Sequence, residues 1–92
     1  MEFEWDRRKD RLNQTKHGVS FSDAQLAFKD RKRVLREDPR HSTPAEKRFF
    51  CFGLVSGGVL TVRFTVRNGR IRIFGAGYWR EGRKYYEKKR RL

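Results

Sequence analysis

The second half of the chain alternates between apolar and polar residues, and this pattern predicts the strands of a sheet. Residues 48–55 are almost wholly apolar, as expected of a central strand, and residues 59–67 alternate strictly. Asn68-Gly69 is a strong signal for a two-residue hairpin turn of type I′. Residues 70–74 complete this hairpin, and Gly75-Ala76-Gly77 is expected to end the sheet.

The first residues predict a short edge strand followed by a helix. Phe3 and Trp5 alternate with glutamates, which is a strand pattern. Asp6 can cap a helix over residues 7–16, and Gly18 can end it in the left-handed conformation. This helix is mostly polar, so we expect it to be buried only shallowly.

A second helix is expected to begin after Ser20, which has capping-box spacing to Asp23. Its apolar stripe is Phe21, Ala24 and Phe28, broadened by Leu26 and Ala27. Residues 33–36 predict a short strand, and residues 37–44 hold both prolines and read as a loop. The basic tail over residues 80–92 is predicted to be helical.

The hairpin register follows from the turn, because side chains alternate between the two faces of a sheet. A two-residue turn pairs Arg67 with Arg70 and, further along, Arg63 with Phe74. One face is then apolar, and we expect it to pack on the N-terminal helices: Val62, Phe64, Val66, Ile71 and Ile73. The other face carries no acidic residue and suits phosphate: Thr61, Arg63, Thr65, Arg67, Arg70, Arg72 and Phe74. An ordinary solvated sheet face is the alternative interpretation.

The length of the turn near Ser56-Gly57-Gly58 determines which side chains of the preceding strand face the core. A two-residue loop places Phe49, Cys51, Gly53 and Val55 on the core side and Arg48 with the arginines, and a three-residue loop exchanges the two sets. We favour the first.

Together these elements predict a single α+β domain over residues 1–92. Two N-terminal helices pack on an antiparallel sheet of three to five strands, and a basic helix closes the chain.

Charge is divided unevenly along the chain. Residues 1–30 hold six basic and six acidic side chains, so the whole net charge of +13 belongs to residues 31–92. Such a field attracts nucleic acid or an acidic protein partner, although basic residues can also serve only to solubilise a surface.

No apolar run approaches the length of a membrane span, and the N-terminus does not resemble a signal peptide. Cys51, the single cysteine, lies among phenylalanines and is expected to be a buried thiol in a cytoplasmic protein.

The residue types and their spacing in the sequence exclude several kinds of active site. No metal-ligand spacing, phosphate-binding glycine loop or serine-hydrolase elbow is present, so we expect neither a metal nor a cofactor. Histidine, carboxylate and many arginines suit RNA cleavage, in which the 2′-hydroxyl attacks its own phosphate. The protein then positions the strand and stabilises a negative phosphorane.

Several motifs resemble the BrnT family of toxins. They are Phe3-Glu4-Trp5-Asp6, Lys16-His17-Gly18-Val19-Ser20-Phe21, His41-Ser42, Glu46-Lys47-Arg48-Phe49, Gly53 and Arg70-Ile71-Arg72-Ile73. The resemblance covers nearly the whole chain. It implies a RelE-like fold and a ribonuclease toxin of a type II toxin–antitoxin pair. It also implies neutralisation by a BrnA-like antitoxin, through which the complex reaches operator DNA.

The resemblance and the charge pattern together suggest site residues. The candidate catalytic residues are Lys16, His17, Glu46, Arg48 and Arg80. The candidate RNA-binding residues are Trp5, Arg63, Arg67, Arg70, Arg72, Tyr78, Trp79, Lys84 and Lys88. Each also has a plainer interpretation: His17 can cap a helix end, Glu46 and Arg48 can be surface charges, and Trp5 can belong to the core edge.

One departure from the family pattern concerns the end of the last strand. The family commonly has Ser-Ala-Arg there, and its arginine is implicated in activity, whereas this chain has Gly75-Ala76-Gly77. Arg80 could substitute, and Tyr78 or Trp79 could stack a base. The alternative is a protein with weak or no cleavage that binds nucleic acid or an antitoxin.

Overall fold

The computed structural model describes residues 1–90, which form one five-stranded sheet with helices on both faces. The strands are β1 (Glu2–Trp5), β2 (Val34–Glu37), β3 (Arg48–Val55), β4 (Gly58–Arg67) and β5 (Arg70–Gly77). The helices are α1 (Arg7–His17), α2 (Phe21–Ala24), the 3-10 helix η1 (Gln25–Lys29) and α3 (Arg80–Arg90). The strand order is β1-β5-β4-β3-β2. The helix predicted over residues 80–92 is therefore present as far as Arg90, and Arg91 and Leu92 lie outside the described residues.

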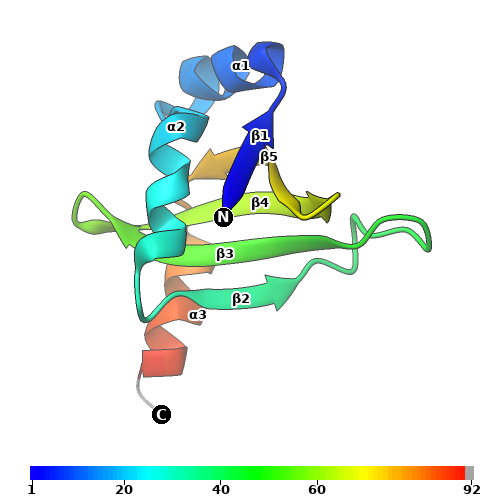
Figure 1. The fold of residues 1–92 in the computed structure, drawn as a ribbon. Helices are drawn as coiled ribbons and strands as arrows, with labels where there is room; N and C mark the ends of the chain where they lie inside the picture. The colour runs from blue at the N-terminus through cyan, green and yellow to red at the C-terminus, as the bar shows by residue number, and fades with distance from the viewer. Residues whose placement is uncertain (91–92) are drawn as a thin grey trace.

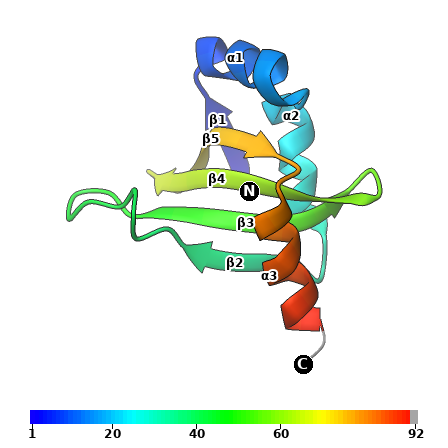
Figure 2. The same ribbon diagram turned by 180° about the vertical axis from the view of Figure 1, so that it is seen from behind.

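The helices lie on opposite faces of the sheet. Figure 1 shows α2 and η1 in front of the sheet, with α1 above its β1–β5 end. Figure 2 shows α3 crossing the other face. The α+β class and the C-terminal helix were predicted correctly. Because the sheet is covered on both sides, the arginine face is not the open platform that strand alternation alone suggested. Among the described residues, no helix is both long and apolar enough to cross a membrane.

The central hairpins have the predicted turns. Asn68 and Gly69 have φ values of 51° and 75°, and Arg67 pairs with Arg70. At the other end, Val55 pairs with Gly58 across a two-residue turn, which confirms the favoured loop length. The predicted pairing of Arg63 with Phe74 is wrong, since Arg63 lies opposite Gly75. A bulge inserts one extra residue into β5 at this point and re-aims the side chains beyond it.

The prediction of a purely antiparallel sheet is also wrong. β1 runs parallel to β5, with Phe3 opposite Ile71 and Trp5 opposite Ile73. Alternation of Phe3 and Trp5 determines which side chains face the core, but it carries no information about strand direction. The sheet is therefore mixed, with β1 and β2 at its edges.

The main core lies between the sheet and the N-terminal helices. Its buried members include Phe21, Ala24, Cys51, Val62 and Ile73. Two residues that were expected to join it do not, since Val66 is 54% exposed and Leu26 is 43% exposed. Val66 lies near the hairpin tip beyond the helices. Leu26 points outward because the second helix continues as a 3-10 helix, with 3.0 residues per turn.

The capping predictions are confirmed at both N-terminal helices. The Asp6 carboxylate accepts hydrogen bonds from the backbone N–H groups of Arg8 and Lys9, at 2.7 and 3.2 Å. Gly18 ends α1 with φ 68°, and the Ser20 hydroxyl accepts from Asp23 N at 3.0 Å. These caps satisfy backbone donors that the first turn of a helix leaves unpaired.

A second core lies between α3 and the other face of the sheet. Phe52, Val59 and Tyr86 are its buried members. Gly82 allows the helix to approach closely, because a Cβ atom there would overlap the Thr61 hydroxyl and lie 2.9 Å from Phe52 Cδ1. The Tyr86 hydroxyl donates to Asp30 Oδ2 at 2.6 Å, and the same oxygen accepts from Leu54 N at 2.8 Å. Asp30 thus joins the end of η1 to β3 and α3.

Candidate functional site

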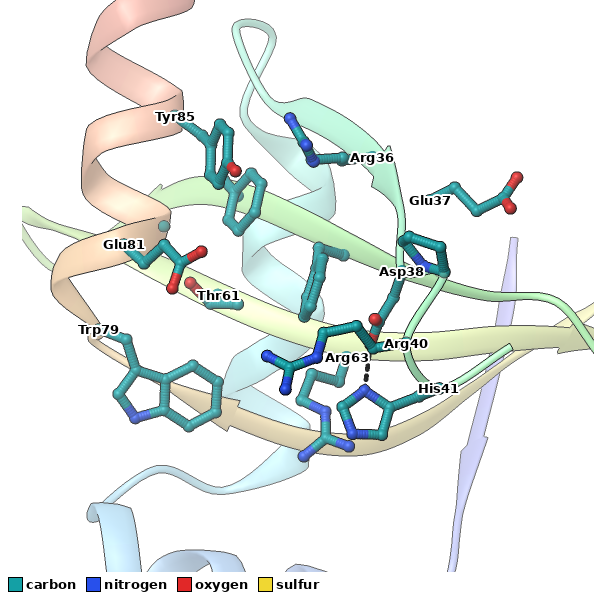
Figure 3. A pocket seen from close by; sticks show the side chains of 14 residues that line it. Arg36, Glu37, Asp38, Arg40, His41, Thr61, Arg63, Trp79, Glu81 and Tyr85 are labelled. Atoms are coloured by element: carbon teal, nitrogen blue, oxygen red, sulfur yellow. Dashed lines mark hydrogen bonds and ion pairs between the residues drawn. The ribbon is translucent and has the colours of Figure 1, made fainter. Parts of the chain in front are cut away.

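A cleft of about 430 Å³ opens between α3 and the loop that joins β2 to β3. Figure 3 shows its two walls: Trp79, Glu81 and Tyr85 on the α3 side, and Arg40 and His41 on the loop side. Phe50 and Phe52 belong to its lining between the walls. The cleft therefore has an aromatic side with the Glu81 carboxylate and an opposite side that holds both basic and acidic residues, namely Arg40, His41, Glu37 and Asp38.

The loop side of the cleft holds a histidine–aspartate pair. His41 Nδ1 lies 2.8 Å from Asp38 Oδ2, and the Asp38 side chain is only 4% exposed whereas that of His41 is 52% exposed. The loop is itself anchored, because Asp38 N donates to Arg48 O at 2.8 Å and the Ser42 hydroxyl donates to Asp38 O at 2.7 Å. A carboxylate at Nδ1 orients the ring and leaves Nε2 free to take or deliver a proton.

Two arginines reach the same part of the cleft. Arg40 and Arg63 line the cleft together with His41, and Figure 3 shows the Arg40 side chain extending toward the Trp79 side. The Arg63 stem passes Gly75, where a Cβ atom would be 3.8 Å from Arg63 Cδ. Among the described residues, no carboxylate forms an ion pair with Arg40 or Arg63. These two groups are thus available for an anion such as phosphate.

The other arginines of this face have acidic partners, so the prediction of a face without acid is wrong. Arg67 Nη2 lies 2.7 Å from Glu46, and Arg48 Nε lies 3.2 Å from it. Arg72 Nη1 is 3.1 Å from Glu4. Alternation along single strands did not reveal these carboxylates, because they come from β1 and from a loop. Thr61 and Thr65 are buried and not solvated.

Glu46 is held in its ionised form. The hydrogen bond from Arg67 is the main reason that the pKa of Glu46 lies below its usual value, and the bond from Arg48 acts in the same direction. Arg48 also stacks on Phe74, with its guanidinium carbon 4.0 Å from the ring centroid. A carboxylate with a lowered pKa is a weaker proton acceptor, so this geometry suits a residue that positions Arg48 and Arg67.

The end of α1 meets the cleft through Trp79. The His17 ring lies edge-on to the Trp79 indole, with 5.2 Å between ring centroids. His17 and Lys16 are exposed and lie outside the lining of the cleft. Arg80, Lys84 and Lys88 follow one another along α3 and border a shallow hollow next to the cleft.

The remaining candidate residues have structural contacts. Trp5 packs edge-on against Phe21, with 6.3 Å between centroids, at the margin of the main core. The Tyr78 hydroxyl donates to Val55 O at 3.1 Å. Arg70 lies 3.4 Å from Glu2 at the exposed edge of the sheet. Of the residues named from the sequence, Arg63 and Trp79 line the cleft.

Gly77 is the position at which the chain lacks the arginine expected from its resemblance to BrnT toxins. It lies opposite Thr61 in the β4–β5 ladder, so a side chain at position 77 would point toward α3 and the cleft. The Trp79 indole occupies this space, since a Cβ atom at position 77 would lie 2.6 Å from Trp79 Cζ2. An arginine at position 77 is incompatible with the observed position of the indole. The positive charge of the cleft comes instead from Arg36, Arg40 and Arg63.

Sequence reasoning missed Asp38, Arg40, His41 and Glu81 as parts of one cleft. The spacing Asp38-x-x-His41 beside a proline was a usable local signal, because a turn brings such side chains together. Glu81 carried no signal, since its position depends on how α3 packs on the sheet. Within residues 1–90, no three His, Cys, Asp or Glu side chains are grouped so that they could hold a metal ion.

A comparison with protein-family models gives a match over most of the chain. A family model described as "Ribonuclease toxin, BrnT, of type II toxin-antitoxin system" matches residues 5–82. A search for similar curated proteins gave no match. The matched range includes β2 to β5, the 38–47 loop and the first residues of α3. It therefore holds every residue that lines the cleft except Tyr85.

Proposed function

Because the chain belongs to the BrnT family of ribonuclease toxins of type II toxin–antitoxin systems, we propose that it cleaves RNA endonucleolytically in the cleft beside α3 and so inhibits translation. The observation that carries this proposal is the convergence of Arg40, Arg63 and the Asp38-supported His41 on one cleft. RelE-like architecture and action in the cytoplasm are part of the same proposal.

The reaction needs no external nucleophile. The 2′-oxygen forms a bond to phosphorus while the bond to the 5′-oxygen breaks, and the products are a 2′,3′-cyclic phosphate and a free 5′-hydroxyl. One proton leaves the 2′-hydroxyl and one joins the leaving oxygen. His41 Nε2 carries a proton in this exchange, and Arg63 and Arg40 stabilise the charge that develops on the phosphorane. Two guanidinium groups at the phosphate supply the stabilisation without a metal ion.

Residues around the cleft guide the strand. Arg80, Lys84 and Lys88 recur at four-residue spacing on α3, so their charges form a row along one helix face. Arg48, Arg67, Arg70 and Arg72 extend the positive surface along the sheet, although each has an acidic partner. Lys16 contributes charge beside the cleft, and His17 supports Trp79.

A BrnA-like antitoxin is the proposed protein partner, and operator DNA is reached only through it. An acidic antitoxin segment would compete with RNA for the positive surface, since residues 31–92 carry the entire net charge of +13.

A second candidate function is a binding module with weak or no cleavage. The observation that favours it is Gly77, which leaves the cleft without the arginine that the family pattern has there.

The test uses purified protein, free of antitoxin, and cellular RNA in EDTA. We expect cleavage with 2′,3′-cyclic phosphate ends, and no cutting where a 2′-deoxynucleotide replaces the nucleophile. Arg63→Ala should lose about 10²–10³ in rate, as for other groups that stabilise charge in a transition state. Arg31→Ala, which removes the same charge from an exposed turn, is the control. Absence of product with folded wild-type protein contradicts the proposal, and salt-dependent RNA binding without product supports the second candidate.

A further inference from the structure

The α3 wall of the cleft carries an indole and a carboxylate to which the proposed cleavage assigns no role. Building on that proposed function, we propose that Trp79 and Glu81 form a subsite that binds a guanine base next to the cleaved phosphate. Trp79 provides the stacking surface, and Glu81 accepts hydrogen bonds from the edge of the base. Figure 3 shows Glu81 between Trp79 and Tyr85, across the cleft from Arg40 and His41.

Trp79 is fixed on the sheet in the way that a stacking platform requires. The absence of a side chain at Gly77 lets the indole lie against the strand, and the His17 ring meets it edge-on at 5.2 Å. Trp79 is only half-buried and lines the cleft, so part of the ring remains accessible. A rigid, partly exposed aromatic ring beside phosphate-binding arginines is a typical arrangement for stacking a nucleobase.

Tyr85 does not serve as a second platform. The Arg36 guanidinium lies over its ring at 4.2 Å, and Phe52 stacks on it with 5.6 Å between centroids. These contacts make Tyr85 a fixed wall. The volume of about 430 Å³ between this wall and the loop is within the range of small-molecule sites.

Glu81 differs from the other acidic residues of the basic region. Glu37, Asp38, Glu46 and Glu87 each have a basic partner within 4.0 Å. Within the described residues, Glu81 forms no ion pair, although arginines line the same cleft. Glu81 is therefore a charged acceptor that the protein itself does not use.

The chemistry of a carboxylate selects among the bases. Its two oxygens accept two parallel hydrogen bonds from a partner with adjacent donors. Guanine has such a pair on its Watson–Crick edge, N1–H and the N2 amino group. Adenine and cytosine place an acceptor beside their amino group, and uracil places two acceptors around one N–H group. A bidentate contact of this kind discriminates between bases by about tenfold to a hundredfold.

The test measures binding of labelled RNA strands with 2′-fluoro sugars, which lack the nucleophile and cannot be cut. The strands contain uracil at every position but one, which holds guanine, inosine, 7-deazaguanine or adenine. We expect guanine and 7-deazaguanine to bind alike, because their Watson–Crick edges are the same. Inosine lacks the N2 amino group and should bind about tenfold more weakly.

Variants identify the groups responsible. Glu81→Gln should bring the guanine-to-inosine ratio toward one, whereas Glu87→Gln, the same charge change six residues later on α3, should leave it unaltered. Trp79→Ala should weaken every strand by about tenfold or more, and Trp79→Phe should restore part of the loss. Circular dichroism of each variant confirms folding.

Two results would overturn the inference: equal binding of guanine and inosine by the wild type, or an unchanged ratio in Glu81→Gln. Failure of the proposed ribonuclease function can be distinguished from failure of the guanine subsite. Cleavage of RNA without a guanine preference in binding removes the base subsite and leaves the ribonuclease. Guanine-selective binding without cleavage in EDTA retains the subsite and removes the proposed reaction.

Discussion

The replacement Gly82→Ala tests whether α3 is seated as closely on the sheet as the cleft requires. In an exposed helix, this change stabilises by about 1 kcal/mol, because alanine is the better helix former. Here the added methyl group would overlap the Thr61 hydroxyl and lie 2.9 Å from Phe52 Cδ1. Both neighbours belong to strands, so neither can move away easily. Overpacking of this kind costs about 1–3 kcal/mol.

The expected balance is a loss of up to about 2 kcal/mol in the free energy of unfolding, because the propensity gain of about 1 kcal/mol offsets part of the overpacking cost of about 1–3 kcal/mol. For a chain of this length, each kcal/mol lowers Tm by about 4–8 °C. Urea titration and thermal unfolding measure the change, and Thr61→Ala in the same chain should recover part of it. Because α3 carries Glu81 and begins directly after Trp79, the variant should also lose guanine discrimination. A more stable Gly82→Ala protein would refute the close packing of α3.

Three further outcomes follow from particular contacts. Asp38→Asn should slow RNA cleavage by about 10²-fold with little change in RNA binding, because His41 loses the carboxylate that orients it; weaker binding with an unchanged rate would contradict this role. Burial raises the pKa of the Cys51 thiol to about 12, so a thiol reagent at neutral pH should react only after urea unfolds the chain. Hydrogen bonds from Arg67 and Arg48 lower the pKa of Glu46; its contribution to stability is therefore present above its usual pKa and is lost as pH falls toward the lowered value. Glu46→Gln should make unfolding less sensitive to pH in this acid range, and an unchanged acid profile would contradict the ion pairs.

Local features of the fold were predictable because their causes lie within a few residues. The Asn68-Gly69 turn and the caps at Asp6 and Ser20 each depend on neighbouring residues, and the structure has all of them. Cys51 was predicted to be buried because it lies among phenylalanines in an almost wholly apolar strand, and it is fully buried.

Features that depend on contacts between distant segments could not be read in the same way. The direction of β1, the bulge at Phe74 and the docking of α3 through Gly82 are decided by packing across the sheet. The candidate site shares this origin. Arg63 and Trp79 could be named from strand and tail patterns, but the partnership of Asp38 with His41 and the position of Glu81 depend on the tertiary fold.

Two histidine variants, compared in the same RNA cleavage assay, distinguish His41 from His17 as the proton carrier. In the proposed reaction, His41 carries the proton, with Asp38 at its Nδ1 and Arg63 in the same cleft. His17 has only a ring contact with Trp79. We therefore predict that His41→Ala loses about 10²-fold or more in cleavage rate, whereas His17→Ala loses only a few-fold. The reverse order, with His17 essential and His41 dispensable, would contradict this assignment of the proton carrier and move the reaction to the end of α1.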